Sequence, residues 1–130
     1  TDYSVLIKMD PRNKEYYENR GLSYLSLGKC ESAISDYSKA ITIDPNKKEY
    51  YENRGAAYLA LEQYESAILD YTETITIDPS YTSAYTGRGS AYMALEQYDL
   101  AKKDFEKFLS LVPEDDQTAV QIKKILNSLE

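Results

Sequence analysis

Four prolines divide the chain into units of equal length. Pro11, Pro45, Pro79 and Pro113 stand 34 residues apart, and the 130-residue sequence contains no other proline. Proline fixes φ and lacks the amide hydrogen that a helix interior needs, so each of the four is expected to end a helix. A fixed period of roughly 20 to 50 residues is typical of proteins that stack one supersecondary unit on the next.

Further columns of residues keep the same period. They are Gly21, Gly55 and Gly89; Tyr17, Tyr51 and Tyr85; Tyr24, Tyr58 and Tyr92; Ala33, Ala67 and Ala101; and Tyr37, Tyr71 and Phe105. Residues 14–47 and 48–81 are identical at 22 of 34 aligned positions, which indicates a recent duplication. Residues 82–115 have diverged further.

Within each unit the apolar residues recur at helical spacing, which predicts two helices per repeat. We place these helices at 14–27 and 30–43, 48–61 and 64–77, and 82–95 and 98–111. The glycine column falls inside the first helices, where glycine costs about 1 kcal/mol relative to alanine. A close approach between the two helices of each repeat would explain it.

The repeated pattern over residues 12–115 resembles the tetratricopeptide repeat family. In each unit a large aromatic residue is followed by glycine, tyrosine, alanine, an aromatic residue and proline. The resemblance implies an all-α, right-handed superhelical solenoid of antiparallel helix pairs. We divide the chain into a second-helix remnant of a preceding repeat (1–11), three repeats (14–47, 48–81 and 82–115) and a C-terminal capping helix (116–130). In the last segment Ala119, Ile122, Leu126 and Leu129 share one face, as a polar-backed cap requires.

The net charge of -7 and the pI near 4.7 place a negative field around the molecule. That field opposes phosphate backbones and anionic lipids, and no apolar run approaches the roughly 18 residues of a membrane span. We therefore expect neither nucleic acid nor membrane as a partner. Cys30 is the only cysteine, which excludes an internal disulfide and favours the cytoplasm.

Catalytic chemistry has no evident basis in the sequence. It contains no histidine, no second cysteine to form a metal pair with Cys30, and no glycine-rich phosphate loop. We therefore expect no enzymatic activity, no cofactor and no metal site.

The repeated tyrosines and arginines are expected to be structural. Tyrosine is enriched at binding hot spots, but most of the 14 tyrosines follow the apolar stripe of the helices and are assigned to the core. Tyr16, Tyr50 and Tyr81 fall outside that stripe. A ladder of ion pairs is predicted from a second set of residues with the same period: Arg20, Arg54 and Arg88 with Asp2, Asp36, Asp70 and Asp104.

A second stripe on the first helix of each repeat is the candidate partner-binding surface. The resemblance implies that it lines a concave groove for peptides. Its four glutamates and deeper apolar side chains suit an extended or helical segment carrying Lys or Arg beside apolar residues. Alternatively, the glutamates only solvate a helix face. The stripe comprises Glu15, Glu18, Asn19, Leu22 and Leu25; Glu49, Glu52, Asn53, Ala56 and Leu59; and Thr86, Ser90 and Met93.

Some members of the family grip a C-terminal carboxylate with lysine, asparagine and arginine side chains. The matching positions here are Glu18, Leu22, Asn53, Ser83 and Gly87, of which only Asn53 fits. The cations are missing and Glu18 would repel a carboxylate, so this mode is not expected.

We therefore predict a protein–protein interaction scaffold that binds a partner segment in the groove. The alternative is a structural module that self-associates through an N-terminal face formed by Tyr3, Leu6 and Ile7, which another copy would cover in concentrated solution.

Overall fold

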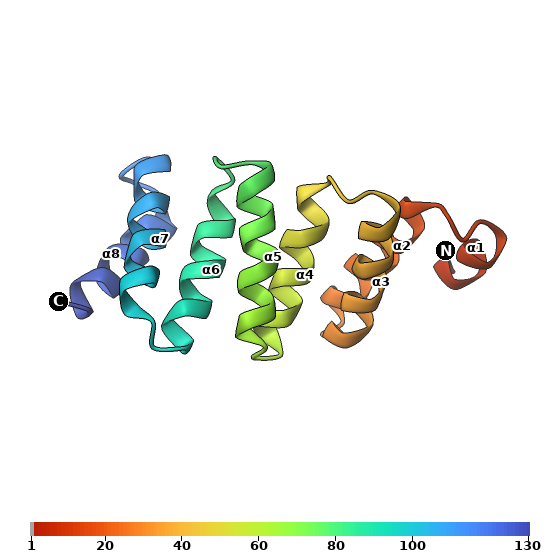
Figure 1. Ribbon diagram of the computed structural model, residues 1–130, viewed down its shortest axis with the longest axis horizontal. Coiled ribbons are helices and arrows are strands. Elements are labelled where there is room, and N and C mark those ends of the chain that lie inside the picture. Colours follow the sequence, from red (N-terminus) through yellow and green to blue (C-terminus); the bar gives the residue numbers. More distant parts are fainter. Residues whose placement is uncertain (1) are drawn as a thin grey trace.

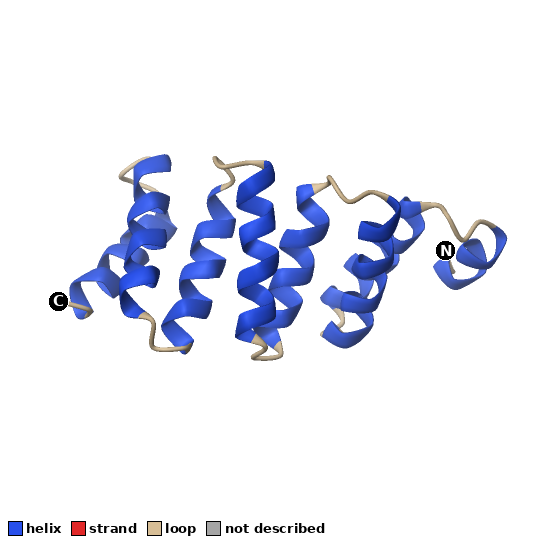
Figure 2. Cartoon of the chain, in the orientation of Figure 1, coloured by secondary structure: helices blue, strands red, loops and turns tan. Residues whose placement is uncertain are grey.

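The computed structural model describes residues 2–130, which form helices joined by short connections (Figures 1 and 2). Thr1, the first residue of the predicted remnant 1–11, lies outside the described residues. The helices stand in a row, and the two termini lie at opposite ends of it (Figure 1). They are α1 (Tyr3–Met9), α2 (Lys14–Ser26), α3 (Cys30–Ile43), α4 (Lys48–Ala60), α5 (Tyr64–Ile77), α6 (Thr82–Ala94), α7 (Tyr98–Leu111) and α8 (Gln117–Ser128).

Backbone geometry ends the helices at corresponding positions of the repeats. Each first helix is followed by a residue in the left-handed region: Gly28 at φ 73°, and Glu62 and Glu96 at φ 59°. This conformation reverses the chain and satisfies terminal carbonyl groups. The helices α3 and α5 end at Asp44 and Asp78, whose backbones are extended as the following proline requires.

The helices pack as a curved, antiparallel array. Neighbours in sequence pack along their lengths, both within repeats (α2 with α3, α4 with α5, α6 with α7) and between them (α3 with α4, α5 with α6). In addition, α4 contacts α6 directly. Because first helices of successive repeats approach each other in this way, the array curves toward the side that they form. This architecture is the predicted helical solenoid.

The glycine column marks close approaches between helices, as expected. A Cβ atom added at Gly21 would lie 3.0 Å from the Tyr37 ring, and one added at Gly89 would lie 2.6 Å from the ring of Phe105. Gly87 is tighter still, because its Cβ would stand 2.4 Å from Cζ of Tyr71. The aromatic rings of the second helices therefore occupy space that a side chain on the first helices would fill.

Tyrosines form much of the core. Tyr37 is fully buried, and Tyr17, Tyr71 and Tyr85 are nearly so. The hydroxyl groups of Tyr17 and Tyr85 donate hydrogen bonds to proline carbonyls six residues earlier, at 2.9 and 2.7 Å. Tyr50 is also fully buried, with its ring centroid 6.3 Å from that of Tyr37. The stripe pattern missed Tyr50 because its partner belongs to the preceding repeat.

A ladder of bidentate ion pairs ties the helices together. In each repeat the guanidinium donates from Nε and Nη2 to both oxygens of one aspartate on the second helix, at 2.6 to 2.8 Å. The Nη1 group donates to a hydroxyl on the preceding second helix, at 3.0 to 3.1 Å. The sets are Arg20 with Asp36 and Ser4, Arg54 with Asp70 and Ser38, and Arg88 with Asp104 and Thr72.

The predicted place of Asp2 in this ladder is wrong. The Asp2 carboxylate accepts a hydrogen bond from the backbone N–H of Ser4 at 3.0 Å and so caps α1. The Ser4 hydroxyl faces Arg20 instead. Each arginine pairs with the aspartate 16 residues later, so Arg20 binds Asp36 and reaches α1 only through the Ser4 hydroxyl.

The two ends of the array differ. At the C-terminal end, Ala119 and Ile122 of α8 are buried against α7, and Leu126 packs beside them, as predicted for a cap. At the N-terminal end, the seven-residue α1 places Ile7 against the core of the first repeat. Tyr3 and Leu6 are half-buried within the chain, while Val5 and Met9 of the same helix are 51% and 77% exposed.

Candidate functional site

The residues predicted to bind a partner all lie on α2, α4 and α6, the first helices of the three repeats. We call this surface the first-helix face. Successive repeats meet along it, since side-chain hydrogen bonds join α2 to the start of α4, and α4 to the start of α6. Its members are Glu15, Glu18, Asn19, Leu22, Leu25, Glu49, Glu52, Asn53, Ala56, Leu59, Thr86, Ser90 and Met93.

The apolar members of this face divide into two groups. Leu25, Leu59 and Met93 are half-buried and pack against the cores of the three repeats. Leu22, by contrast, is 43% exposed and offers apolar surface to a ligand. At the equivalent positions the other repeats carry the smaller, exposed Ala56 and Ser90. The apolar part of the face is therefore strongest in the first repeat.

Glu18 is engaged within the protein. Nζ of Lys47 lies 3.1 Å from its Oε2 atom, and the Tyr50 hydroxyl donates to the same oxygen at 3.2 Å. Lys47 is the N-cap of α4 and Tyr50 lies in its first turn, so these contacts connect α2 to the start of α4. Burial raises the pKa of Tyr50, and the Glu18 charge raises it further. The negative charge of Glu18 is thus already balanced by Lys47.

Glu52, the equivalent of Glu18 in the second repeat, is held differently. Its Oε2 accepts a hydrogen bond from the Tyr81 hydroxyl at 2.8 Å, and its Oε1 accepts one from the Ser83 hydroxyl at 2.8 Å. Burial, and then the hydrogen bond to Glu52, raise the pKa of Tyr81 to about 12. Both donors are neutral, so the carboxylate is oriented without losing its charge.

A buried hydroxyl lies beneath the face between these two glutamates. Tyr37 is fully buried, and its Oη has no hydrogen-bond partner within residues 2–130. Burial, followed by the charges of Glu18 and Asp36, raises its pKa. The Asn53 amide lies close enough to oppose that rise, although not in hydrogen-bonding geometry. An unpaired buried hydroxyl normally costs free energy, so this one calls for an explanation.

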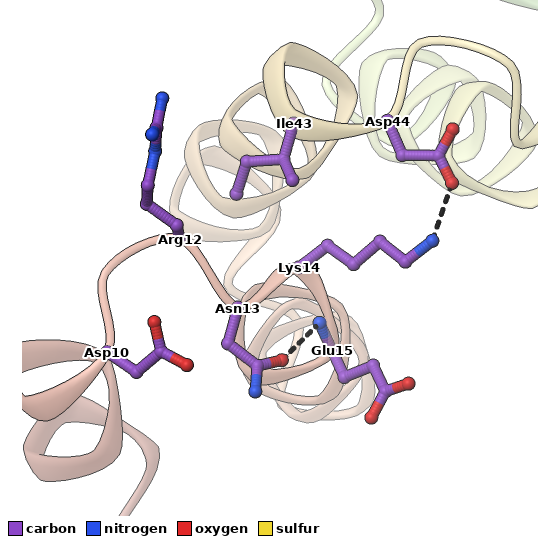
Figure 3. A pocket seen from close by; sticks show the side chains of 7 residues that line it. All are labelled: Asp10, Arg12, Asn13, Lys14, Glu15, Ile43 and Asp44. Carbon is purple, nitrogen blue, oxygen red and sulfur yellow. Dashed lines mark hydrogen bonds and ion pairs between the residues drawn. The ribbon is translucent and has the colours of Figure 1, made fainter.

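A separate hollow of about 510 Å³ lies at the edge of the array, where the α1–α2 connection meets the end of α3 (Figure 3). Nζ of Lys14 contacts Oδ2 of Asp44 at 2.7 Å, and Arg12 points away from this pair (Figure 3). The same Lys–Asp pair recurs one repeat later, with Lys48 and Asp78 at 2.7 Å. Glu15 is the member of the first-helix face that reaches this hollow.

Within residues 2–130, no group of His, Cys, Asp and Glu side chains is placed to hold a metal ion. In the same range no helix has both the length and the apolar character needed to cross a membrane.

Known proteins share this architecture. A family model described as a TPR repeat matches residues 21–62, and two tetratricopeptide repeat models match residues 49–81 and 82–115. The Arabidopsis OM64 TPR domain is 31% identical over 90% of this chain and 96% of its own, with a TM-score of 0.84. The chain belongs to the tetratricopeptide repeat family.

Two further solved tetratricopeptide structures illustrate the similarity. The first TPR of Spaghetti (RPAP3), bound to the HSP90 peptide SRMEEVD, is 32% identical over 92% of this chain and 95% of its own (TM-score 0.82). The crystal structure of MamA is 26% identical over 97% of this chain and 77% of its own (TM-score 0.86). No curated protein matches the chain significantly. All three matching family models describe tetratricopeptide repeats.

The positions that correspond to the carboxylate grip of this repeat family are occupied by other contacts. Glu18 pairs with Lys47, Ser83 binds Glu52, and the space above Gly87 is taken by the Tyr71 ring. Leu22 is exposed and cannot donate a hydrogen bond. The structure therefore brings together no cations at these positions.

Sequence reasoning missed the partners of the two glutamates. Lys47, Tyr50 and Tyr81 surround Glu18 and Glu52, yet none of them was placed on the stripe. A signal was present, because position 47 holds lysine where the next repeat has Tyr81, and Tyr50 aligns with alanine. These two positions, at which successive repeats differ, mark the junctions where the glutamates have different partners.

Proposed function

We propose that this tetratricopeptide domain binds a segment of a partner protein on its first-helix face, and that the segment carries basic and apolar side chains. The observation that supports this is the charge of the face, which has no lysine or arginine among its members and in which Glu15, Glu49 and Glu52 form no ion pair within residues 2–130. Opposite charge on a partner speeds association and disfavours acidic competitors. Leu22 supplies an adjacent apolar contact.

Solved relatives support the general mode. The Spaghetti domain is described as bound to the HSP90 peptide SRMEEVD, and the second TPR domain of human RPAP3 as in complex with the HSP70 peptide SGPTIEEVD. Both peptides end in EEVD, a sequence with two glutamates and an aspartate. The negative face of the present chain would repel such a sequence, so we propose the same kind of surface with inverted charge preference.

The test is a selection of 12-residue peptides from a phage-displayed random library. We expect enrichment of Lys or Arg beside apolar residues, and loss of binding to a Glu15→Lys, Glu49→Lys double variant. These glutamates lie in the first turns of α2 and α4, and neither side chain forms a hydrogen bond or an ion pair within residues 2–130. Glu31→Lys with Glu65→Lys is a matched control, because these glutamates lie in the first turns of α3 and α5.

Selection of no peptide, or of peptides that bind the Glu15→Lys, Glu49→Lys variant as well as the wild type, would contradict the proposal.

Self-association through Tyr3, Leu6 and Ile7 is the second candidate. Val5 and Met9 on the same short helix are exposed and favour it. Sedimentation velocity over a hundredfold concentration range distinguishes the two, because a self-assembling module gains mass and a monomeric peptide binder does not. A cytoplasmic location stays a prediction from the single cysteine.

A further inference from the structure

The two junctions on the first-helix face are equivalent in sequence position but differ in charge. At the first junction, Glu18 faces Lys47, with Nζ and Oε2 separated by 3.1 Å. At the second junction, the residue in the place of Lys47 is Tyr81, and its hydroxyl donates to Glu52. The repeat has therefore kept the glutamate and replaced its internal cation by a neutral donor.

Glu52 forms no ion pair within residues 2–130. The cations near it in the chain are engaged elsewhere: Lys48 with Asp78 at 2.7 Å and Arg54 with Asp70 at 2.8 Å. The hydroxyl donors described above fix the two carboxylate oxygens of Glu52, one each. The carboxylate is half-buried. A charge that is partly removed from water, oriented and left without a counter-ion is prepared for an external cation.

The unpartnered Tyr37 hydroxyl is a second, independent feature of the same place. It is buried beneath the face, where the charges of Glu18 and Glu52 and the amide of Asn53 all act on it. Its oxygen retains acceptor capacity that no group of the described protein uses.

We infer that Glu52 binds one basic side chain of the partner segment, preferably an arginine, at the junction of α4 and α6. This inference rests on the proposed peptide-binding function and makes it specific. A guanidinium has five N–H donors in a planar fork, enough to bind the Glu52 carboxylate and to leave donors free for the Tyr37 oxygen. Glu49, one turn earlier on α4, adds negative charge nearby. Glu18 does not bind the basic side chain, because its carboxylate already pairs with Lys47.

The experiment uses the peptides selected as described above, labelled with a fluorophore and titrated by fluorescence anisotropy. Glu52→Gln removes the charge, and Tyr81→Lys supplies the internal cation that the first junction already has. Each should weaken binding by about tenfold or more, since a charge-assisted hydrogen bond is lost. Glu65→Gln, at an exposed position on α5 outside the first-helix face, is the control and should change the dissociation constant by less than about twofold. Glu18→Gln should cost less affinity than Glu52→Gln, because Lys47 already pairs with Glu18.

A peptide in which the critical arginine is replaced by citrulline, its neutral isostere, completes the cycle. It should bind the wild type about tenfold more weakly and should lose no further affinity on Glu52→Gln, because the two changes remove the same contact. Tyr37→Phe should also weaken the arginine peptide, by a few-fold, which a hydroxyl with a purely structural role would not do. Circular dichroism of each variant confirms folding, and Tyr81→Lys retains the Glu52 side chain if Glu52→Gln proves unstable.

The outcomes separate the two proposals. If peptides are selected and bind the first-helix face but are insensitive to both Glu52→Gln and Tyr81→Lys, the Glu52 site is wrong and the general function stands. Equal losses for Glu18→Gln and Glu52→Gln would likewise overturn the inference that the second junction is special. If the library yields no peptide, the proposed function fails and this site fails with it.

Discussion

Removal of the Asp70 carboxylate tests the ion-pair ladder at a buried point. The Asp70 side chain is 5% exposed, and Nε and Nη2 of Arg54 each donate to it at 2.8 Å. Burial raises the pKa of Asp70, and the hydrogen bonds from Arg54 oppose that rise. Asp70→Ala leaves the guanidinium with two unpaired donors in a site where its side chain is 20% exposed.

The expected magnitude follows from that geometry. Breaking a buried ion pair by removing one partner costs about 3 to 5 kcal/mol. The residual exposure of Arg54 places the value near the lower end, at about 3 kcal/mol. The entropy of unfolding is about 2 cal/mol/K per residue, or about 0.27 kcal/mol/K for a chain of this length. The melting temperature should therefore fall by about 10 °C.

Differential scanning calorimetry measures this shift, and Asp44→Ala is the matched control. Asp44 also pairs with a cation at 2.7 Å, but the side chains of Lys14 and Asp44 are 39% and 29% exposed. Solvent screens such a pair, so its loss should lower the melting temperature by less than about 2 °C. Equal shifts for Asp70→Ala and Asp44→Ala would refute the argument that burial makes the ladder structural.

Three further predictions concern packing, hydrogen bonding and pH. Gly89→Ala should lower the free energy of unfolding, measured in urea, by about 1 to 2 kcal/mol, because the added methyl group meets the Phe105 ring at 2.6 Å. Gly55→Ala is the comparison: its nearest contact is at 3.3 Å, so it should be neutral or stabilising. Tyr37→Phe should leave urea stability unchanged or higher, since no hydrogen bond is lost; a loss above about 1 kcal/mol would reveal a partner. The hydrogen bond from Lys48 lowers the pKa of Asp78 from 3.8 to about 2. The ionised Asp78 carboxylate therefore stabilises the fold fully above about pH 3.8, and this stabilisation is lost as the pH falls to about 2. Asp78→Asn should therefore flatten the decline of the urea midpoint between about pH 4 and pH 2.

Most of the fold could be predicted because its determinants recur with the period. The helices begin at Lys14, Cys30, Lys48 and the equivalent later residues, as predicted from the apolar spacing. The first helices end one residue earlier than expected, at Ser26 in the first repeat. The next residue is the C-cap that leads into the left-handed turn, and apolar spacing carries no information about that turn.

The chemistry of the binding face was less accessible to sequence reasoning. The pairing of Arg20, Arg54 and Arg88 with aspartates could be predicted because both partners repeat. Glu18 and Glu52 also repeat, and they looked equivalent, but their environments are set by residues 47 and 81, which do not. Contacts between successive first helices join residues 29 to 32 positions apart, so their identification required the curvature of the array.

The fit of the Tyr71 ring over Gly87 also bears on the order in which the repeats can be assembled. The first two repeats are nearly interchangeable, so a chain of this kind risks exchanging helices between copies or pairing them out of sequence. Asn53 stands at the position of Gly87 on α4 and lies beside Tyr37 of α3, whereas at the next junction the Tyr71 ring takes the space that a Cβ at Gly87 would fill, at 2.4 Å. The α5–α6 junction therefore differs in shape from the α3–α4 junction, which disfavours the exchange of one for the other during assembly.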